Sequence, residues 1–150
     1  MPSMPPASHL TQTTGYLLSK LGGASTERFS SALESLGLRP KHCGLLAAVQ
    51  AWPMASQQML GRALGLVPSA IVAMMDDLEA MDAIQRVPAN EDRRRYGIVL
   101  TAQGQSLLKR ATTLARRLDD ALLDPLSEQE RRQLNDSLGK LAAVHLKPAP

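Results

Sequence analysis

The chain has 150 residues, with 17 Lys and Arg against 14 Asp and Glu, one Cys and only four aromatic side chains. This length favours one compact domain, alone or with an oligomerisation element, and a core built from Leu, Ala, Val, Ile and Met favours helices. The single Cys43 excludes an internal disulfide framework and a multi-cysteine zinc site, and the lack of any run of about 18 apolar residues argues against a membrane-spanning helix.

The first half of the chain predicts two helices. The Pro-rich ends, residues 1–8 and 147–150, are expected to be disordered. Apolar residues recur at helical spacing over 10–36, and Gly37 is a suitable stop for that helix. Pro40 suits the first turn of a second helix, over 40–52, which Pro53 ends.

Two short helices follow, joined by a turn that contains glycine. Ser56 is a good N-cap for a helix over 57–64, which Gly65 closes. Pro68 opens the next helix, over 68–81. Two helices with so short a connection predict a helix-turn-helix motif.

A β-hairpin is expected after this motif. The β-prone runs 83–87 and 96–100 flank a polar loop over 88–95. Residues 86–95 hold four arginines against Glu91 and Asp92, a net charge of +2. Most of the basic excess of the chain therefore lies on the hairpin.

The last third predicts two more helices. Thr101 is a good N-cap for a helix that reaches about residue 123, before Pro125. Ser127 and Glu130 form a capping-box pattern at the start of the final helix. The apolar residues of that helix form one stripe: Leu134, Leu138, Leu141 and Val144. The fold class is therefore mostly α, a winged helix-turn-helix with a small β-hairpin wing between N- and C-terminal helices.

This order resembles the MarR (multiple antibiotic resistance regulator) family of bacterial transcription factors. Four segments carry the resemblance: Leu64-Gly65-Leu66-Val67-Pro68-Ser69, Asp76-Asp77-Leu78-Glu79, Asn90-Glu91-Asp92-Arg93-Arg94-Arg95 and Val99-Leu100-Thr101-Ala102-Gln103-Gly104. The resemblance implies a homodimeric regulator, typically a repressor, that binds a pseudo-palindromic DNA operator. It assigns residues 9–38 and 102–146 to dimerisation and residues 39–101 to DNA binding. The apolar stripes of the terminal helices independently favour a dimer.

The DNA contacts follow from the winged-helix arrangement, in which the second helix enters the major groove and the wing reaches the minor groove or phosphates. By resemblance, Asp92 and Arg94 act as a pair that places an arginine in the minor groove, and Arg93 and Arg95 either contact phosphates or stay in solvent. The remaining candidates lie on the two helices: Gln57, Gln58 and Arg62 for phosphates, and Ser69, Ala70, Val72 and Ala73 for bases.

The recognition helix departs from the family pattern, Pro-Ser-Thr-x-Thr-Arg. Pro68-Ser69-Ala70-Ile71-Val72-Ala73 leaves little direct hydrogen-bond readout, so the apolar residues could contact only thymine methyl groups. The later acids of the helix region repel phosphate: Asp76, Asp77, Glu79 and Asp82. Either specificity rests on the wing and DNA shape, or the protein is a ligand- or protein-binding module with weakened operator binding.

The family resemblance also implies control by a small aromatic or phenolic effector. The candidate lining residues are Tyr16, Ser19, Lys20, His42 and Trp52. Cys43 is interpreted as a structural thiol rather than an oxidant sensor. The scattered histidines predict no metal site, no catalytic or cofactor motif is present, and we expect a cytoplasmic protein that is not an enzyme and binds no membrane.

Overall fold

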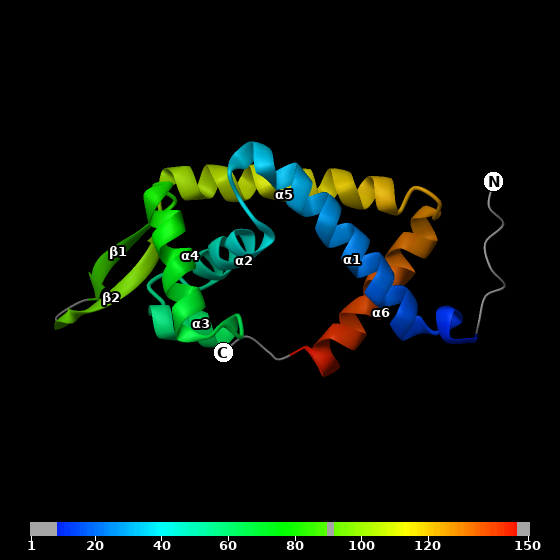
Figure 1. Ribbon diagram of the computed structural model, residues 1–150, viewed down its shortest axis with the longest axis horizontal. Helices are drawn as coiled ribbons and strands as arrows, with labels where there is room; N and C mark the ends of the chain where they lie inside the picture. The colour runs from blue at the N-terminus through cyan, green and yellow to red at the C-terminus, as the bar shows by residue number, and fades with distance from the viewer. Residues whose placement is uncertain (1–8, 90–91, 147–150) are drawn as a thin grey trace.

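The computed structural model describes residues 9–89 and 92–146, and for 92–94 it describes the backbone alone. The ends predicted to be disordered lie outside the described residues. The chain is mostly helical, as predicted, with one two-stranded hairpin (Figure 1). The elements are α1 (Thr14–Leu33), α2 (Pro40–Ala51), α3 (Gln57–Ala63), α4 (Pro68–Ala80), β1 (Ile84–Ala89), β2 (Asp92–Leu100), α5 (Ala102–Leu122) and α6 (Glu128–His145).

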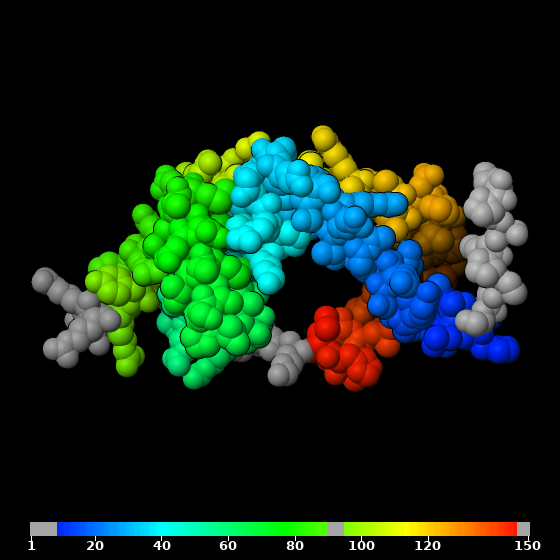
Figure 2. Space-filling view, in the orientation of Figure 1, coloured from blue at the N-terminus to red at the C-terminus, as the bar shows by residue number. Residues whose placement is uncertain are grey.

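The elements form an open arch. Helices α2, α3 and α4 and the hairpin gather at one end, α1 and α6 cross in this view at the other, and α5 spans the two (Figure 1). Figure 2 shows the surface hollowed between α6 and the α2 to α4 region. The accessible surface is 11027 Å², against roughly 7,500 Å² for a compact monomer of this mass. The last helix, α6, therefore does not fold back on the central domain.

One hydrophobic core lies in the winged-helix end. Its fully buried side chains come from the end of α1, from α2, α3, α4 and β2: Leu33, Leu45, Leu46, Val49, Leu60, Met75, Leu78 and Ile98. Leu107, Leu108 and Ala111 add the first half of α5. The first half of α1, the second half of α5 and all of α6 contribute no fully buried residue to this core, although Leu114 of α5 packs against it.

The helix boundaries follow local signals. Ser56, Thr101 and Ser127 each accept a hydrogen bond from a backbone N–H of the helix they cap, as predicted. Glu130 completes the box by accepting from the Ser127 N–H at 2.8 Å, and this bond is the first cause of its lowered pKa. Gly37, at φ 67°, occupies the left-handed conformation that a β-carbon disfavours.

Two predicted boundaries were wrong. The single helix over 10–36 is split into a 3₁₀ turn (His9–Gln12), α1 and a second 3₁₀ turn (Glu34–Leu36). The polar loop over 88–95 is shorter, since the strands extend to Ala89 and begin again at Asp92. Pairing of Pro88 with Tyr96 continues the antiparallel ladder beyond the predicted runs. Proline is tolerated there because β1 is an edge strand.

A glycine lets β2 pair on its second side. Met54 N–H donates to the Ile98 carbonyl and Ile98 N–H donates to the Ala55 carbonyl, both at 3.0 Å. Gly97 precedes Ile98 in β2. A β-carbon on Gly97 would lie 2.8 Å from the Met54 Cα and from the Met54 carbonyl oxygen. The wing is therefore attached to the loop between α2 and α3, in addition to its own hairpin ladder.

The Leu-Thr-x-x-Gly segment joins the wing to α5. Thr101 N–H donates to the Ala83 carbonyl at 3.1 Å, and the Thr101 hydroxyl donates to the Asp82 carbonyl. A β-carbon at Gly104 would lie 1.9 Å from the Ala83 carbonyl oxygen, so no larger residue fits. The start of α5 is thereby fixed against the junction of α4 and β1.

Within residues 9–89 and 92–146, no single helix combines the length and apolar composition needed to cross a membrane, although the sharply bent pair α3 and α4 would pass on those two criteria together.

Candidate nucleic-acid interface

The helix-turn-helix is formed by α3 and α4, which meet at 113°, within the usual range for this motif, about 90–120°. Gly65 takes the left-handed conformation in the turn, at φ 64°. Leu66 N–H donates to the Gly61 carbonyl at 2.8 Å. A β-carbon at Gly61 would lie 3.4 Å from the Ile71 side chain, so the helices pack closely where they cross. This crossing directs the outer face of α4 to solvent.

Most of the predicted base-contacting residues lie on that outer face. Ser69, Val72 and Ala73 are exposed, whereas Ala70 is half-buried. The opposite face of α4 fills the core with Ile71, Met74, Met75 and Leu78. The helix is thus anchored by one face and presents the other, without any basic side chain along its length.

The bracing helix α3 exposes the predicted phosphate contacts Gln58 and Arg62 and half-buries Gln57. It also exposes Met59, which is not among the predicted contacts. The wing lies beyond α4 at the same end of the molecule (Figure 1). The Asp92, Arg93 and Arg94 side chains lie outside the described residues, while Arg95 has an exposed side chain.

The acidic residues of α4 are engaged with basic groups of the same chain. Asp77 Oδ2 accepts from Arg39 Nη2 at 2.9 Å and lies 3.0 Å from His42 Nε2. The hydrogen bond to His42, followed by the charges and the hydrogen bond to Arg39, lowers the pKa of Asp77. Glu79 lies 3.0 Å from Arg86 Nε.

These ion pairs reduce the net charge that α4 and the base of the wing present to solvent. Arg86 also lies 3.8 Å from Asp76, so this wing arginine bridges two acids of α4. Arg86 belongs to the +2 charge of residues 86–95, and it is paired with acids of α4 within the same chain. Likewise, Arg39 and Arg86 lie against the acids of α4, which therefore repel phosphate less than an unpaired cluster would.

The five predicted effector residues do not meet in one place. Tyr16, Ser19 and Lys20 lie in the first turns of α1, where the Lys20 ammonium stands 5.6 Å from the Tyr16 ring centroid. His42 is buried at the start of α2 and is occupied by Asp77. Trp52 caps the opposite end of α2, about 15 Å further along the helix axis at 1.5 Å per residue.

A cavity of about 160 Å³ lies instead between α1, α2 and α5. Its lining combines an aromatic ring, hydroxyls and one carboxylate: Ser25, Thr26, Phe29, Pro40, Ala115, Leu118 and Asp119. This set and the five predicted residues do not overlap. The sequence carried no signal for the cavity, because its walls come from segments about 90 residues apart.

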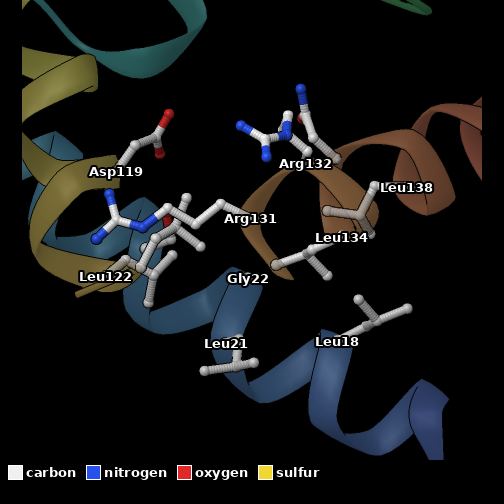
Figure 3. Close-up of a pocket in the computed structure, with 12 residues that line it drawn as sticks. Leu18, Leu21, Gly22, Asp119, Leu122, Arg131, Arg132, Leu134 and Leu138 are labelled. Atoms are coloured by element: carbon white, nitrogen blue, oxygen red, sulfur yellow. The ribbon is translucent and has the colours of Figure 1, made fainter. Parts of the chain in front are cut away.

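A larger groove of about 530 Å³ opens between α1, the end of α5 and α6 (Figure 3). Leu18 and Leu21 face Leu134 and Leu138 across it, with polar side chains at the upper rim that include Arg131, Arg132 and Asp119. The structure describes every residue of α6, and not one of them is buried. An 18-residue amphipathic helix thus has its apolar stripe largely uncovered in the single chain.

Cys43 packs against the core, half-buried near the start of α2. Burial raises the pKa of the Cys43 thiol by more than a backbone hydrogen bond lowers it. A raised pKa reduces the reactive thiolate fraction. Across the described residues, no group of three or more His, Cys, Asp or Glu side chains is placed to hold a metal ion.

Comparison with known proteins identifies transcriptional regulators, although no protein-family model matches. The chain is 31% identical over 143 residues to the HTH-type transcriptional regulator YcgE of Bacillus subtilis, covering 91% of this chain and 89% of that protein. It is 32% identical over 105 residues to a transcriptional regulatory protein for the hcr operon of Thauera aromatica, covering 70% of this chain. The chain spans 63% of that relative's length, and 52% of the length of PecS from Dickeya dadantii.

Solved structures give the same result. The repressor CouR bound to a 23-mer DNA duplex has a TM-score of 0.80 and 29% identity, covering 93% of this chain and 99% of CouR. The MarR family protein Rv2887 of Mycobacterium tuberculosis, in complex with salicylic acid, has a TM-score of 0.73 and 30% identity. That match covers 86% of this chain and 96% of Rv2887.

Proposed function

Since this chain belongs to the MarR family of winged-helix, DNA-binding transcriptional regulators, we propose that it is a homodimeric repressor of a pseudo-palindromic operator. A small aromatic acid releases it from the DNA. The observation that carries the proposal is the outer face of α4, which the 113° crossing with α3 presents beside the wing. Two such faces in a dimer would read half-sites about 34–36 Å apart, one turn of the duplex.

The wing supplies most of the positive charge at the DNA in this proposal. Arg94 enters the minor groove, where a narrow A·T-rich groove concentrates negative potential. Asp92 holds the wing geometry, and Arg93 contacts a phosphate. Gln58 and Arg62, exposed on α3, contact the backbone beside the major groove.

The dimer is built from the terminal helices, 9–38 and 102–146. The apolar stripe of α6 is exposed, and its Leu134 and Leu138 form one wall of the groove between α1 and α6. A second copy could place its own α6 stripe against this groove and bury both. A two-fold arrangement satisfies both copies at once, since each supplies the same surfaces.

The effector site is the cavity between α1, α2 and α5. Phe29 offers a face for an aromatic ring, and the Ser25 and Thr26 hydroxyls can hydrogen-bond a carboxylate or phenol. Salicylic acid, bound by the relative Rv2887, is the probe of first choice. Pro40 lines the cavity and adjoins Arg39, which holds Asp77 of α4, so a ligand that displaces the start of α2 also displaces the recognition helix.

The test is a titration of the full chain against a fragment of its own promoter region at two salt concentrations, with random DNA as competitor. We expect the chain to bind the promoter fragment far more tightly than random DNA. The affinity for the promoter should fall at high salt and on addition of salicylate. Arg94→Ala should lose most of the promoter affinity while remaining dimeric. Equal affinity for promoter and random DNA would contradict the operator function.

A second candidate is a ligand- or protein-binding module with weakened operator binding. It is favoured by the absence of Lys, Arg, Asn and Gln from α4 and by the exposure of Val67 and Val72 on its outer side. Under this alternative, salicylate would bind the chain with no change in DNA affinity, and DNA binding would show only the salt dependence of phosphate contacts.

A further inference from the structure

The outer face of α4 is a single stripe of four residues. Ser69, Val72, Ala73 and Asp76 follow one another at spacings of three, one and three, which places them on one side of a helix. Val67, the N-cap residue, precedes them and is 62% exposed, while Val72 is 41% exposed. The surface that faces a major groove is therefore mainly apolar.

Hydrogen-bond readout from this stripe is restricted. Arg, Lys, Asn and Gln make the usual bidentate contacts to bases, and none occurs among the 13 residues of α4. Ser69 has one hydroxyl. Asp76 carries a negative charge beside Arg86, so it can accept only from an amino group and is repelled by phosphates.

The exposed valines do not serve the core or the helix. Ile71, Met74, Met75 and Leu78 provide the buried face of α4, so Val72 adds nothing to that packing. Valine is also a weaker helix former than alanine, and an exposed position gives it no compensating contact. Its side chain is stiff at χ1, which holds both methyl groups in one place without a large entropic cost on binding.

The major groove offers one apolar feature to such a surface, the C5-methyl group of thymine. We infer that Val67 and Val72 read thymine methyl groups, and that this contact is the sequence-specific part of recognition by α4. The inference rests on the proposed operator binding and states which contact with the bases makes that binding sequence-specific. The operator half-sites therefore contain thymines whose methyl groups, rather than their hydrogen-bonding atoms, determine affinity.

The experiment begins with the full chain and a random duplex library, from which repeated rounds of binding select the operator. Each thymine of a half-site is then replaced in turn by 2′-deoxyuridine, which pairs identically but lacks the methyl group. We expect one or two positions to lose about fourfold in affinity, as the loss of one buried methyl contact predicts. In Val72→Ala, the deoxyuridine penalty at one of these positions should disappear.

Gln50→Ala is the control, because Gln50 is exposed on α2, which carries none of the proposed contacts to DNA or to the second copy. This variant should keep the full deoxyuridine penalty. If every deoxyuridine duplex binds as tightly as the thymine duplex, the inference is wrong although operator binding stands. A penalty that persists unchanged in both Val67→Ala and Val72→Ala also overturns it. If no operator is selected, the proposed function fails first, and the inference fails with it.

Discussion

His42 Nε2 lies 3.0 Å from Asp77 Oδ2, so a buried imidazole at the start of α2 holds a carboxylate of the recognition helix. The other ring nitrogen, Nδ1, accepts from the Arg39 N–H at 3.1 Å, which assigns the proton to Nε2 and makes it the donor to Asp77. The Arg39 guanidinium binds the same carboxylate oxygen. These contacts join α4 to the start of α2, where Pro40 lines the proposed effector cavity.

Replacing His42 should destabilise the fold and loosen α4. His42 is only 3% exposed, and His42→Ala would leave a cavity and an unpaired backbone N–H at Arg39. We expect a loss of about 2–4 kcal/mol in the free energy of unfolding, measured by urea denaturation. His9→Ala, at an exposed histidine, should change the free energy little. Equal stability of the two variants would show that the imidazole contributes nothing.

Stability should depend on pH through Asp77. Its pKa is lowered in the folded state, chiefly by the hydrogen bond to His42, so near its ordinary value of 3.8 the unfolded chain binds more protons. The stabilisation of the fold by the ionised Asp77 carboxylate is therefore complete above pH 3.8, and it is lost as the pH falls through the lowered pKa.

The matching variant is Asp77→Asn, which has no carboxylate to protonate. The difference in free energy of unfolding between the natural chain and Asp77→Asn should be largest at pH 6 and shrink toward pH 3. A difference that stays constant over this range would show that the ion pair does not stabilise the fold.

Gly104 should accept no side chain. Its β-carbon would lie 1.9 Å from the Ala83 carbonyl oxygen and 2.8 Å from the Ala83 carbonyl carbon, so Gly104→Ala must displace α5 from the α4–β1 junction. We expect a loss of about 3 kcal/mol, read as a lower melting temperature. Gly23→Ala is the control, because its β-carbon meets nothing within 4 Å and alanine favours a helix. A melting temperature unchanged in Gly104→Ala would contradict the contact.

The sequence predicted local structure better than long-range contacts. Ser127 and Glu130 lie within one helical turn, so their capping box could be read directly from the pattern. By contrast, Asp77 and His42 are 35 residues apart, and only the fold brings them together. Gly104 was recognised as part of a motif, but its reason, the contact with Ala83, needed the packing of α5.

The site was partly predictable for the same reason. Ser69, Val72 and Ala73 could be assigned to the outer face of α4, because helical spacing decides which residues share a face. The effector residues were chosen by side-chain type, and helix spacing does not say which helices enclose a cavity. Phe29, from α1, and Ala115, from α5, line the cavity that the fold creates.

A charge placed in the apolar stripe of α6 should break the proposed dimer. Leu138 lines the groove with α1 and is 38% exposed in the single chain, so Leu138→Glu would bury a carboxylate against a partner. We expect sedimentation equilibrium to report a monomer, with loss of operator binding. Ala143→Glu adds the same charge to the opposite, exposed face of α6 and should remain dimeric. Dimers of equal affinity in both variants would exclude this stripe from the interface.

Filling the cavity between α1, α2 and α5 should abolish the response to an aromatic acid while leaving DNA binding intact. Ala115 is half-buried at its wall, and in Ala115→Met three further heavy atoms would occupy the space that Phe29, Ser25 and Thr26 enclose. Titration calorimetry should show that salicylate binds the natural chain and no longer binds this variant. The variant should also stay on promoter DNA at salicylate concentrations that release the natural chain. Ala102→Met, at an exposed position in the first turn of α5, should respond as the natural chain does. If Ala115→Met binds salicylate as tightly as the natural chain, the effector lies elsewhere, and the coupling through Pro40, Arg39 and Asp77 loses its starting point.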